Sequence, residues 1–195
     1  YFLFPMRLSD PGFIPLDWWT WQVPSYHLVF GYCLAFLQNF APLKSVTYLV
    51  YLVTWVAVAA GFYLLALRFC RHPRLVFLST LLWINLSMGN LDSLGGLYIL
   101  SEYLQPSHVA GAGMILGLGL LFWEHYLCAG LVLGMAGIFH AGLMAAFGPI
   151  FFVQFLVQEG FHLKSKRFWN HAFRFWIPLS LFWIPVCVAA LKAEQ

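Results

Sequence analysis

Five long apolar runs, separated by short polar stretches, set the strongest limit on how this chain can fold. Only 9% of its 195 residues are charged, whereas a soluble globular domain has roughly 25%. Ten Lys and Arg with seven Asp and Glu cannot cover the surface of a soluble protein of this size. We therefore expect an all-α, polytopic transmembrane helical bundle, not a secreted enzyme, a disordered tail or a nucleic-acid-binding protein. The expected helices occupy residues 44–67, 75–88, 106–123, 126–158 and 173–191.

The longest apolar run, residues 126–158, has too many positions for one helix across a bilayer. A helix over this run would be about 50 Å long, against a hydrocarbon core of about 30 Å. A polar ring and a flexible residue interrupt the run at His140, Ala141 and Gly142, and an alternative break lies at Gly148 and Pro149. We expect two short helices that meet at His140. The bundle then has about six to seven membrane-embedded helices, including short or interfacial ones.

Basic residues gather in two stretches, one after the run 44–67 and one before the run 173–191. Basic loop residues stay on the cytoplasmic side during insertion, so both stretches are expected inside. This requires an even number of crossings between them, which the break at His140 supplies. The stretches hold Arg68, Arg71, Arg74, Lys164, Lys166, Arg167 and Arg174. Four of them, Arg71, Arg74, Lys166 and Arg167, also suit anionic lipid headgroups, and their spacing does not separate this role from that of setting the orientation.

Residues 1–43 differ in composition from the bundle that follows. Residues 7–26 combine several prolines with Trp18, Trp19 and Trp21, and Trp favours the headgroup layer. The apolar centre of residues 24–40 is short for a span, so we expect a helix along the interface. We predict one transmembrane domain, residues 1–195, with an outer loop and interfacial helix over 1–43 and a bundle over 44–195. Because the chain opens on Tyr1, we expect a fragment that lacks its first span.

With residues 24–40 on the interface, four acids are expected on the outer side. Asp10 and Asp17 stand among Trp and Pro residues, where partial desolvation suits a carboxylate to accept a proton from an incoming hydroxyl. The alternatives are a turn at Asp10 and a helix cap at Asp17. Asp92 and Glu102 are candidates for substrate binding, and their alternative role is that of solvated loop acids.

Seven histidines and four cysteines raise the question of a metal or haem site, but their spacing does not support one. There is no HxxxH, HExxH or CxxC pattern, so we expect no metal ligands and no disulfide framework. The cofactor, if one is used, is unknown from the sequence. His108 and His140 are the best placed, because both are expected at outer helix ends beside the acidic loop. They are candidates for substrate binding, and interface histidine is the alternative.

Two stretches carry a resemblance to a known family. The first is SDPGFIPLDWW, residues 9–19, and the second is QPSHVAGAGMILGLGLLFWEHYLCAGLVLGMAGIFHAGLMA, residues 105–145. The first is similar to the loop after the first span in bacterial members of the GT-C superfamily of polytopic membrane glycosyltransferases. The second resembles their Pro-started span, short inner turn and Ala-Gly-rich helix that ends in His or Lys. The resemblance implies a multi-pass protein of the bacterial inner membrane.

The resemblance further implies an activity: transfer of a sugar from a lipid-linked, polyprenyl-phosphate donor to an acceptor at the outer face. Asp17 or Asp10 would be the base that activates the acceptor hydroxyl, while cations stabilise the departing phosphate. The expected outer face offers few cations, chiefly Arg7, Lys44 and the two histidines. The bilayer and the lipid-linked donor are therefore the expected partners, and no nucleic acid is expected.

Two other functions remain open at this point. A transporter or lipid flippase needs charged residues deep within the spans, and none is evident. A non-catalytic membrane subunit would use its small-residue faces for assembly. Gly113 with Gly117, and Gly130 with Gly134, have the spacing that lets helix backbones approach closely in lipid.

Overall fold

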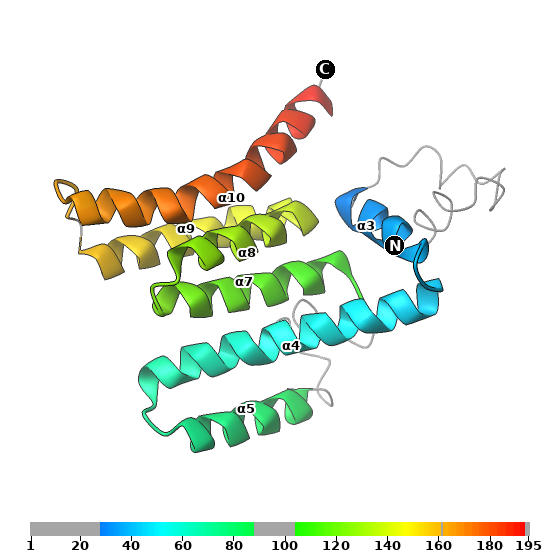
Figure 1. Cartoon of the computed structure of the whole chain (residues 1–195), viewed down its shortest axis with the longest axis horizontal. Coiled ribbons are helices and arrows are strands. Elements are labelled where there is room, and N and C mark those ends of the chain that lie inside the picture. The colour runs from blue at the N-terminus through cyan, green and yellow to red at the C-terminus, as the bar shows by residue number, and fades with distance from the viewer. Residues whose placement is uncertain (1–27, 88–103, 161, 194–195) are drawn as a thin grey trace.

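Seven α-helices make up the part of the chain that the structure describes, and these residues contain no strand. The computed structural model describes residues 28–87, 104–160 and 162–193. The expected all-helical fold is confirmed over these residues (Figure 1). The helices are α3 (Leu28–Gln38), α4 (Leu43–Phe69), α5 (Pro73–Ser87), α7 (Pro106–Phe122), α8 (Tyr126–Phe139), α9 (Ala141–Glu159) and α10 (Lys166–Ala193).

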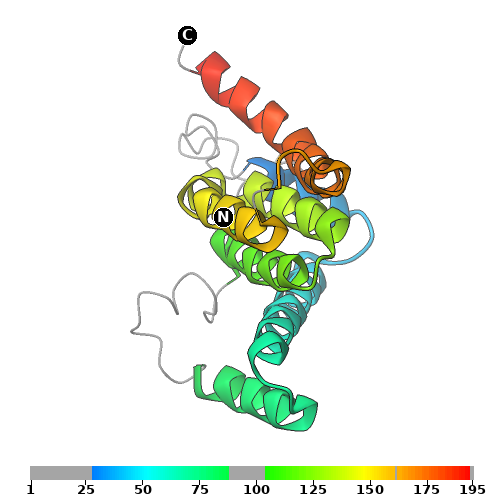
Figure 2. The ribbon, with the colours of Figure 1, turned by 90° about the vertical axis from the view of Figure 1, so that its left-hand side faces the viewer.

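The helices from α4 onward run alternately in opposite directions (Figure 1). Helix α7 packs between α4 and α8, and α8 packs between α7 and α10. Helix α5 lies on the outside of α4, and α9 lies beside α8, as the end-on view of Figure 2 shows. Each described connection is therefore at one of two ends of the bundle. The basic end holds the turns α4–α5, α7–α8 and α9–α10, and the distal end holds the start of α4, the start of α7 and the α8–α9 junction.

Two described helices are long and apolar enough to cross a membrane, by length and composition: Leu43–Phe69 and Gly142–Glu159. Helix α4 has 27 residues and is about 40 Å long, which exceeds a hydrocarbon core of about 30 Å. Helix α3 has 11 residues, about 16 Å, and is too short to span. Large apolar side chains of α4 face outward, with Tyr48 64% and Leu52 59% exposed.

The expected break in the long apolar run is confirmed at His140. Helix α8 ends at Phe139, and α9 begins at Ala141 and continues through Pro149 without a second break. His140 has φ −153° and ψ 87°, outside the helical region, and its ring caps α9. Gly160, with φ 66°, ends α9 in the left-handed conformation that glycine adopts without a steric penalty.

Helix α10 begins earlier than its apolar composition indicates. The sequence predicts residues 173–191, but the helix starts at Lys166. Phe168, Ala172 and Phe175 are buried at helical spacing, so the polar first turns still present an apolar face to the bundle. The Ser165 hydroxyl accepts a hydrogen bond from the Arg167 amide at 3.2 Å, which caps this start.

Glycines allow the central helices to approach closely. A Cβ placed at Gly61 of α4 would lie 2.6 Å from the amide nitrogen of Leu116 in α7. A Cβ at Gly130 of α8 would collide with the carbonyl oxygen of Phe175 in α10. The packing role expected for Gly130 is therefore confirmed, and the small-residue faces are used within this chain.

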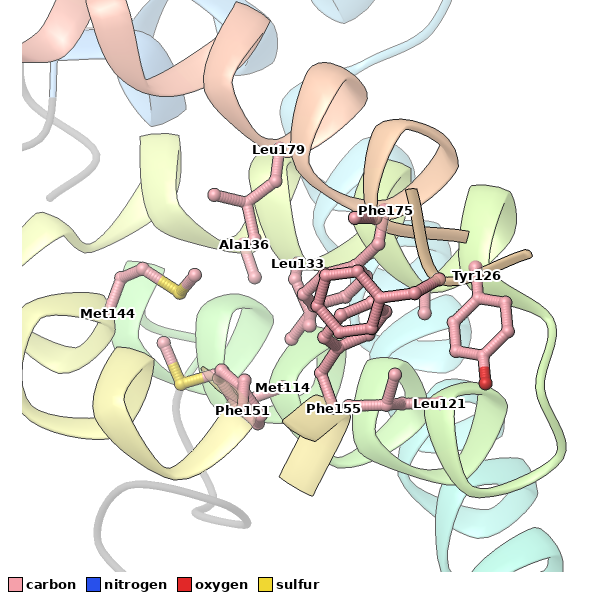
Figure 3. Packing of buried hydrophobic residues seen from close by; sticks show 13 residues of the cluster. Met114, Leu121, Tyr126, Leu133, Ala136, Met144, Phe151, Phe155, Phe175 and Leu179 are labelled. Atoms are coloured by element: carbon pink, nitrogen blue, oxygen red, sulfur yellow. The ribbon is translucent and has the colours of Figure 1, made fainter. Parts of the chain in front are cut away.

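The largest group of buried apolar side chains lies between α7, α8, α9 and α10 (Figure 3). Phe155 of α9 is at its centre, 1% exposed. Its ring stacks on Phe175 of α10 with centroids 5.5 Å apart and planes 6° apart, and it contacts Tyr126 of α8 edge to face at 5.5 Å. These rings join α9 to its neighbours through side chains.

Candidate functional site

The distal end of the bundle carries the described residues that were predicted to bind substrate. Helix α3 packs here against the start of α4, the start of α7 and the end of α8, through Phe30, Leu34, Val46 and Leu104. The beginning of α3, the end of α5 and the beginning of α7 all lie at this end (Figure 1). The chain therefore passes into residues 1–27 and 88–103 from the distal end.

The four predicted acids, Asp10, Asp17, Asp92 and Glu102, lie outside the described residues. The same holds for Arg7. Asp17 precedes α3 in the sequence, and Asp92 and Glu102 belong to the connection between α5 and α7. The described fold therefore shows the end at which these segments join the bundle, and the positions of the carboxylates remain predictions.

His108 is built into the start of α7. It is only 1% exposed, and its Nδ1 accepts a hydrogen bond from the Gln105 amide at 3.3 Å. The Gln105 side chain accepts from the third backbone amide of the helix in return, which completes a reciprocal cap around Pro106 at the first helical position. The structure thus assigns His108 a capping role, with little of its ring accessible at the surface.

His140 is more accessible than His108 and occupies the break between α8 and α9. Its Nδ1 accepts a hydrogen bond from the Leu143 amide at 3.1 Å, so the ring caps α9. The side chain is half-buried. Because α7 and α8 run antiparallel and pack together, His108 at the start of α7 and His140 after α8 are at the same end of the bundle. Their position at the outer membrane face and their role in substrate binding stay predictions.

An open groove of about 550 Å³ lies at the distal end, along the first turns of α4. The lining is mostly apolar, and among the described residues that line it the only charged group is the exposed ammonium of Lys44. The remaining lining residues are Leu43, Thr47 and Tyr48, and the Thr47 hydroxyl donates to the Leu43 carbonyl at 2.8 Å. A cation at the mouth of an apolar groove can hold a phosphate whose attached chain is hydrocarbon.

A second polar cluster lies at the basic end and was not predicted as a site. Glu159 at the end of α9 is 9% exposed, and one of its oxygens accepts hydrogen bonds from the Tyr126 hydroxyl and from His171 Nδ1, the latter at 2.8 Å. The Tyr126 and His171 rings stack with centroids 4.6 Å apart. The cluster ties α8, α9 and α10 together, and its two donors compensate for the burial of the carboxylate.

No local sequence pattern marks this cluster, because its residues are far apart in the chain. Tyr126 and Glu159 are separated by 33 positions, and Glu159 and His171 by 12. The sequence offered only a weak signal, which was an acid at the end of an apolar run and a histidine in the first turns of the next helix. Nearby, Glu124 and Arg167 form an exposed ion pair at 3.7 Å.

Within the described ranges, no three His, Cys, Asp or Glu side chains come together as metal ligands. Comparisons with known proteins give no match, whether to a family model, a curated protein or a solved structure.

Proposed function

We propose that the chain is a multi-pass protein of the bacterial inner membrane, with its basic end in the cytoplasm. Apolar side chains on α4, α5, α9 and α10 face outward, as lipid-facing residues do. The two basic stretches predicted for the cytoplasmic side lie at one end of the bundle, because the helices alternate in direction (Figure 1). The first turns of α10 combine exposed Lys166, Arg167 and Arg174 with exposed Trp169 and Phe173, and basic and aromatic side chains of this kind are typical of the headgroup layer.

Within that arrangement the proposed activity is sugar transfer from a polyprenyl-phosphate-linked donor to an acceptor at the outer face. The observation that carries it is the Lys44 groove, which offers a cation and an apolar wall at the end opposite the basic loops. A polyprenyl-phosphate sugar has the matching parts, an anionic phosphate on a long hydrocarbon chain. The distal end is also where the segments with the four predicted acids join the bundle.

In the proposed reaction an acceptor hydroxyl attacks the anomeric carbon of the sugar. The bond between that carbon and the phosphate oxygen breaks, and polyprenyl phosphate leaves with the bonding electron pair. Asp17, or alternatively Asp10, takes the proton of the hydroxyl, and Lys44 stabilises the charge that develops on the departing phosphate. His140, Asp92 and Glu102 are assigned to substrate binding, and His108 supports the site by capping α7.

The two alternative functions receive less support from the described residues. In α4, α5, α7, α8 and α9 the charged side chains lie in the first or last turn, whereas a coupled transporter places them near the bilayer midplane. A purely structural subunit would present its small-residue faces to a partner. Gly61 and Gly130 instead pack against helices of this same chain.

Two measurements on the full-length protein test the proposal. Single cysteines at Asp17 and at Arg71, in a background without native cysteines, are treated with a membrane-impermeant thiol reagent on intact cells. We expect labelling at position 17 from outside, and labelling at position 71 only after cell rupture. The reverse pattern would overturn the orientation.

The second measurement follows radiolabelled sugar as it leaves a polyprenyl-phosphate donor in membranes that carry the protein. We expect Asp17→Asn to reduce transfer by at least about a hundredfold, the usual scale for loss of a general base. Asp10→Asn serves as the matched carboxylate variant. Full activity in both single variants and in the double variant would contradict a role for either acid as the base.

A further inference from the structure

A second open groove, of about 400 Å³, lies between α4 and α5 near the basic end. Helix α4 contributes Tyr63, and α5 contributes residues of its first two turns. The Tyr63 ring contacts Phe77 edge to face, with centroids 6.4 Å apart. The α5 residues are Pro73, Arg74, Phe77 and Leu78.

The groove has an ordered polarity along α5. Arg74 stands in the first turn of the helix, at the basic end, and Phe77 and Leu78 follow one turn further in. Phe77 is 54% exposed and Leu78 is 60% exposed, so the wall beyond the guanidinium is an accessible apolar surface. A ligand that fits this order has an anionic group followed by a hydrocarbon chain.

The positive charge at this groove is not neutralised by the described part of the protein. Arg68, Arg71 and Arg74 fall within seven positions around the α4–α5 turn, and none forms an ion pair there. The two described acids that lie at the basic end are engaged elsewhere, Glu124 with Arg167 and Glu159 with His171. The arginines can therefore take an external anion, and guanidinium groups bind phosphate oxygens in a bidentate manner.

Among the described helices, few protein side chains cover α5, so its surface is available to such a ligand. Its principal packing partner among the described helices is α4. Only Val76 and Thr80 are buried between Pro73 and Leu82. The groove between α4 and α5 is therefore open to the outside of the described fold, and α5 lies at the edge of the described helices (Figure 2).

We propose that this groove binds one anionic phospholipid of the cytoplasmic leaflet. Arg74, assisted by Arg71, holds the phosphate, and an acyl chain lies along Phe77 and Leu78. A free phosphate would use the arginines but leave the apolar wall uncovered, whereas a phospholipid uses both. The inference rests on the proposed membrane location and is independent of sugar transfer, which uses the other end of the bundle.

The test is lipid retention by the purified full-length protein in detergent, measured by native mass spectrometry. Delipidated protein is titrated with phosphatidylglycerol or phosphatidylcholine of the same acyl composition. We expect one phosphatidylglycerol to bind more tightly than any phosphatidylcholine, and Arg74→Gln to weaken it about fivefold. The matched control is Lys164→Gln, an exposed cation at the same end but in the α9–α10 turn, which leaves the affinity unchanged.

Leu78→Gln tests the acyl-chain half of the proposal, since this side chain is exposed and its replacement is not expected to affect folding. We expect weaker phosphatidylglycerol binding without a change in the unfolding midpoint. Equal retention of the two lipids, equal loss in Arg74→Gln and Lys164→Gln, or full displacement by millimolar inorganic phosphate would each overturn the proposal. So would a second copy of the chain in the groove, seen as a dimer that excludes lipid. Failure of sugar transfer would leave the binding result unchanged, which separates the two proposals.

Discussion

His171 stacks on Tyr126, and both side chains hydrogen-bond to the same oxygen of Glu159. Three helices contribute one residue each to this cluster, and the carboxylate is nearly excluded from solvent. A buried charged acceptor is stabilising only while its donors are present, and its removal leaves those donors without a partner. The cluster therefore holds together the start of α8, the end of α9 and the first turns of α10 at the basic end.

The first prediction concerns this carboxylate. Glu159→Ala is expected to lower the free energy of unfolding by about 2–4 kcal/mol, because the buried Tyr126 and the half-buried His171 lose their acceptor. Glu159→Gln keeps one oxygen acceptor and is expected to cost less. The measurement is denaturant unfolding in detergent, followed by Trp fluorescence. Glu124→Ala, which breaks the exposed ion pair with Arg167, is the control and should cost about 0–1 kcal/mol. Equal losses at positions 124 and 159 would show that the cluster adds nothing.

The second prediction concerns the close approach of α8 and α10. Gly130→Ala introduces a methyl group into the space of the Phe175 carbonyl, so one helix must shift. We expect a loss of about 1–3 kcal/mol, the usual cost of overpacking. Gly148→Ala in α9 adds the same methyl group where nothing lies within 4 Å, and it should change stability by less than about 1 kcal/mol. If both variants behave alike, the glycine contact is not tight in solution.

The third prediction concerns the aromatic centre of the core. Phe155→Ala is expected to cost about 3–5 kcal/mol, because the ring is buried and stacks on Phe175. Phe147→Ala removes a ring from the same helix, but one that is 43% exposed, and should cost far less. Thermal unfolding of the two variants under identical detergent conditions checks the difference. A comparable loss at both positions would place α9 in a different rotation from the one described.

Much of the fold could be predicted from the lengths of the apolar runs and the positions of the basic residues. The break at His140 could be predicted because length and charge placement require it independently, and the structure has both helix ends there. The gathering of both basic stretches at one end follows from the same count of helices. The early start of α10 could not be predicted from apolar content, because Phe168 and Ala172 bury one face of a segment that also carries Lys166, Arg167, Asn170 and His171.

The candidate site was predictable only in part. His108 and His140 were expected at one end of the bundle, and their helix ends lie there. Their capping hydrogen bonds depend on backbone geometry that spacing alone does not reveal. The Glu159 cluster depends on which turns of α8, α9 and α10 meet, and that is set by packing between residues 33 positions apart. No periodicity carries such information.

The fourth prediction separates the capping role of His140 from its proposed role in substrate binding. His140→Ala loses the acceptor for the Leu143 amide and should cost about 1 kcal/mol of stability. His140→Ser supplies a hydroxyl acceptor at the same cap position, so stability should be retained while the imidazole is lost. A binding role predicts a raised KM for sugar transfer in both variants. Unchanged kinetics in His140→Ser would leave His140 with the cap alone.

The last prediction concerns Lys44, the charged group in the distal groove. If Lys44 stabilises the departing phosphate, Lys44→Gln should lower kcat more than it raises KM, because the charge on the phosphate oxygen increases as the bond to the sugar breaks. A loss of about ten- to a thousandfold in kcat/KM is the scale expected for one such interaction. Lys44→Arg keeps the charge and should retain more activity.

Stability supplies the control for this last variant. Lys44 is exposed, so its replacement should leave the unfolding midpoint unchanged within measurement error. Tyr48→Phe, in the same groove, keeps the apolar wall and the ring and removes only a hydroxyl. It should leave both kinetic constants close to those of the wild type. If Lys44→Gln instead raises KM and leaves kcat unchanged, Lys44 contributes to donor binding in the ground state, since uniform binding alters KM and not kcat.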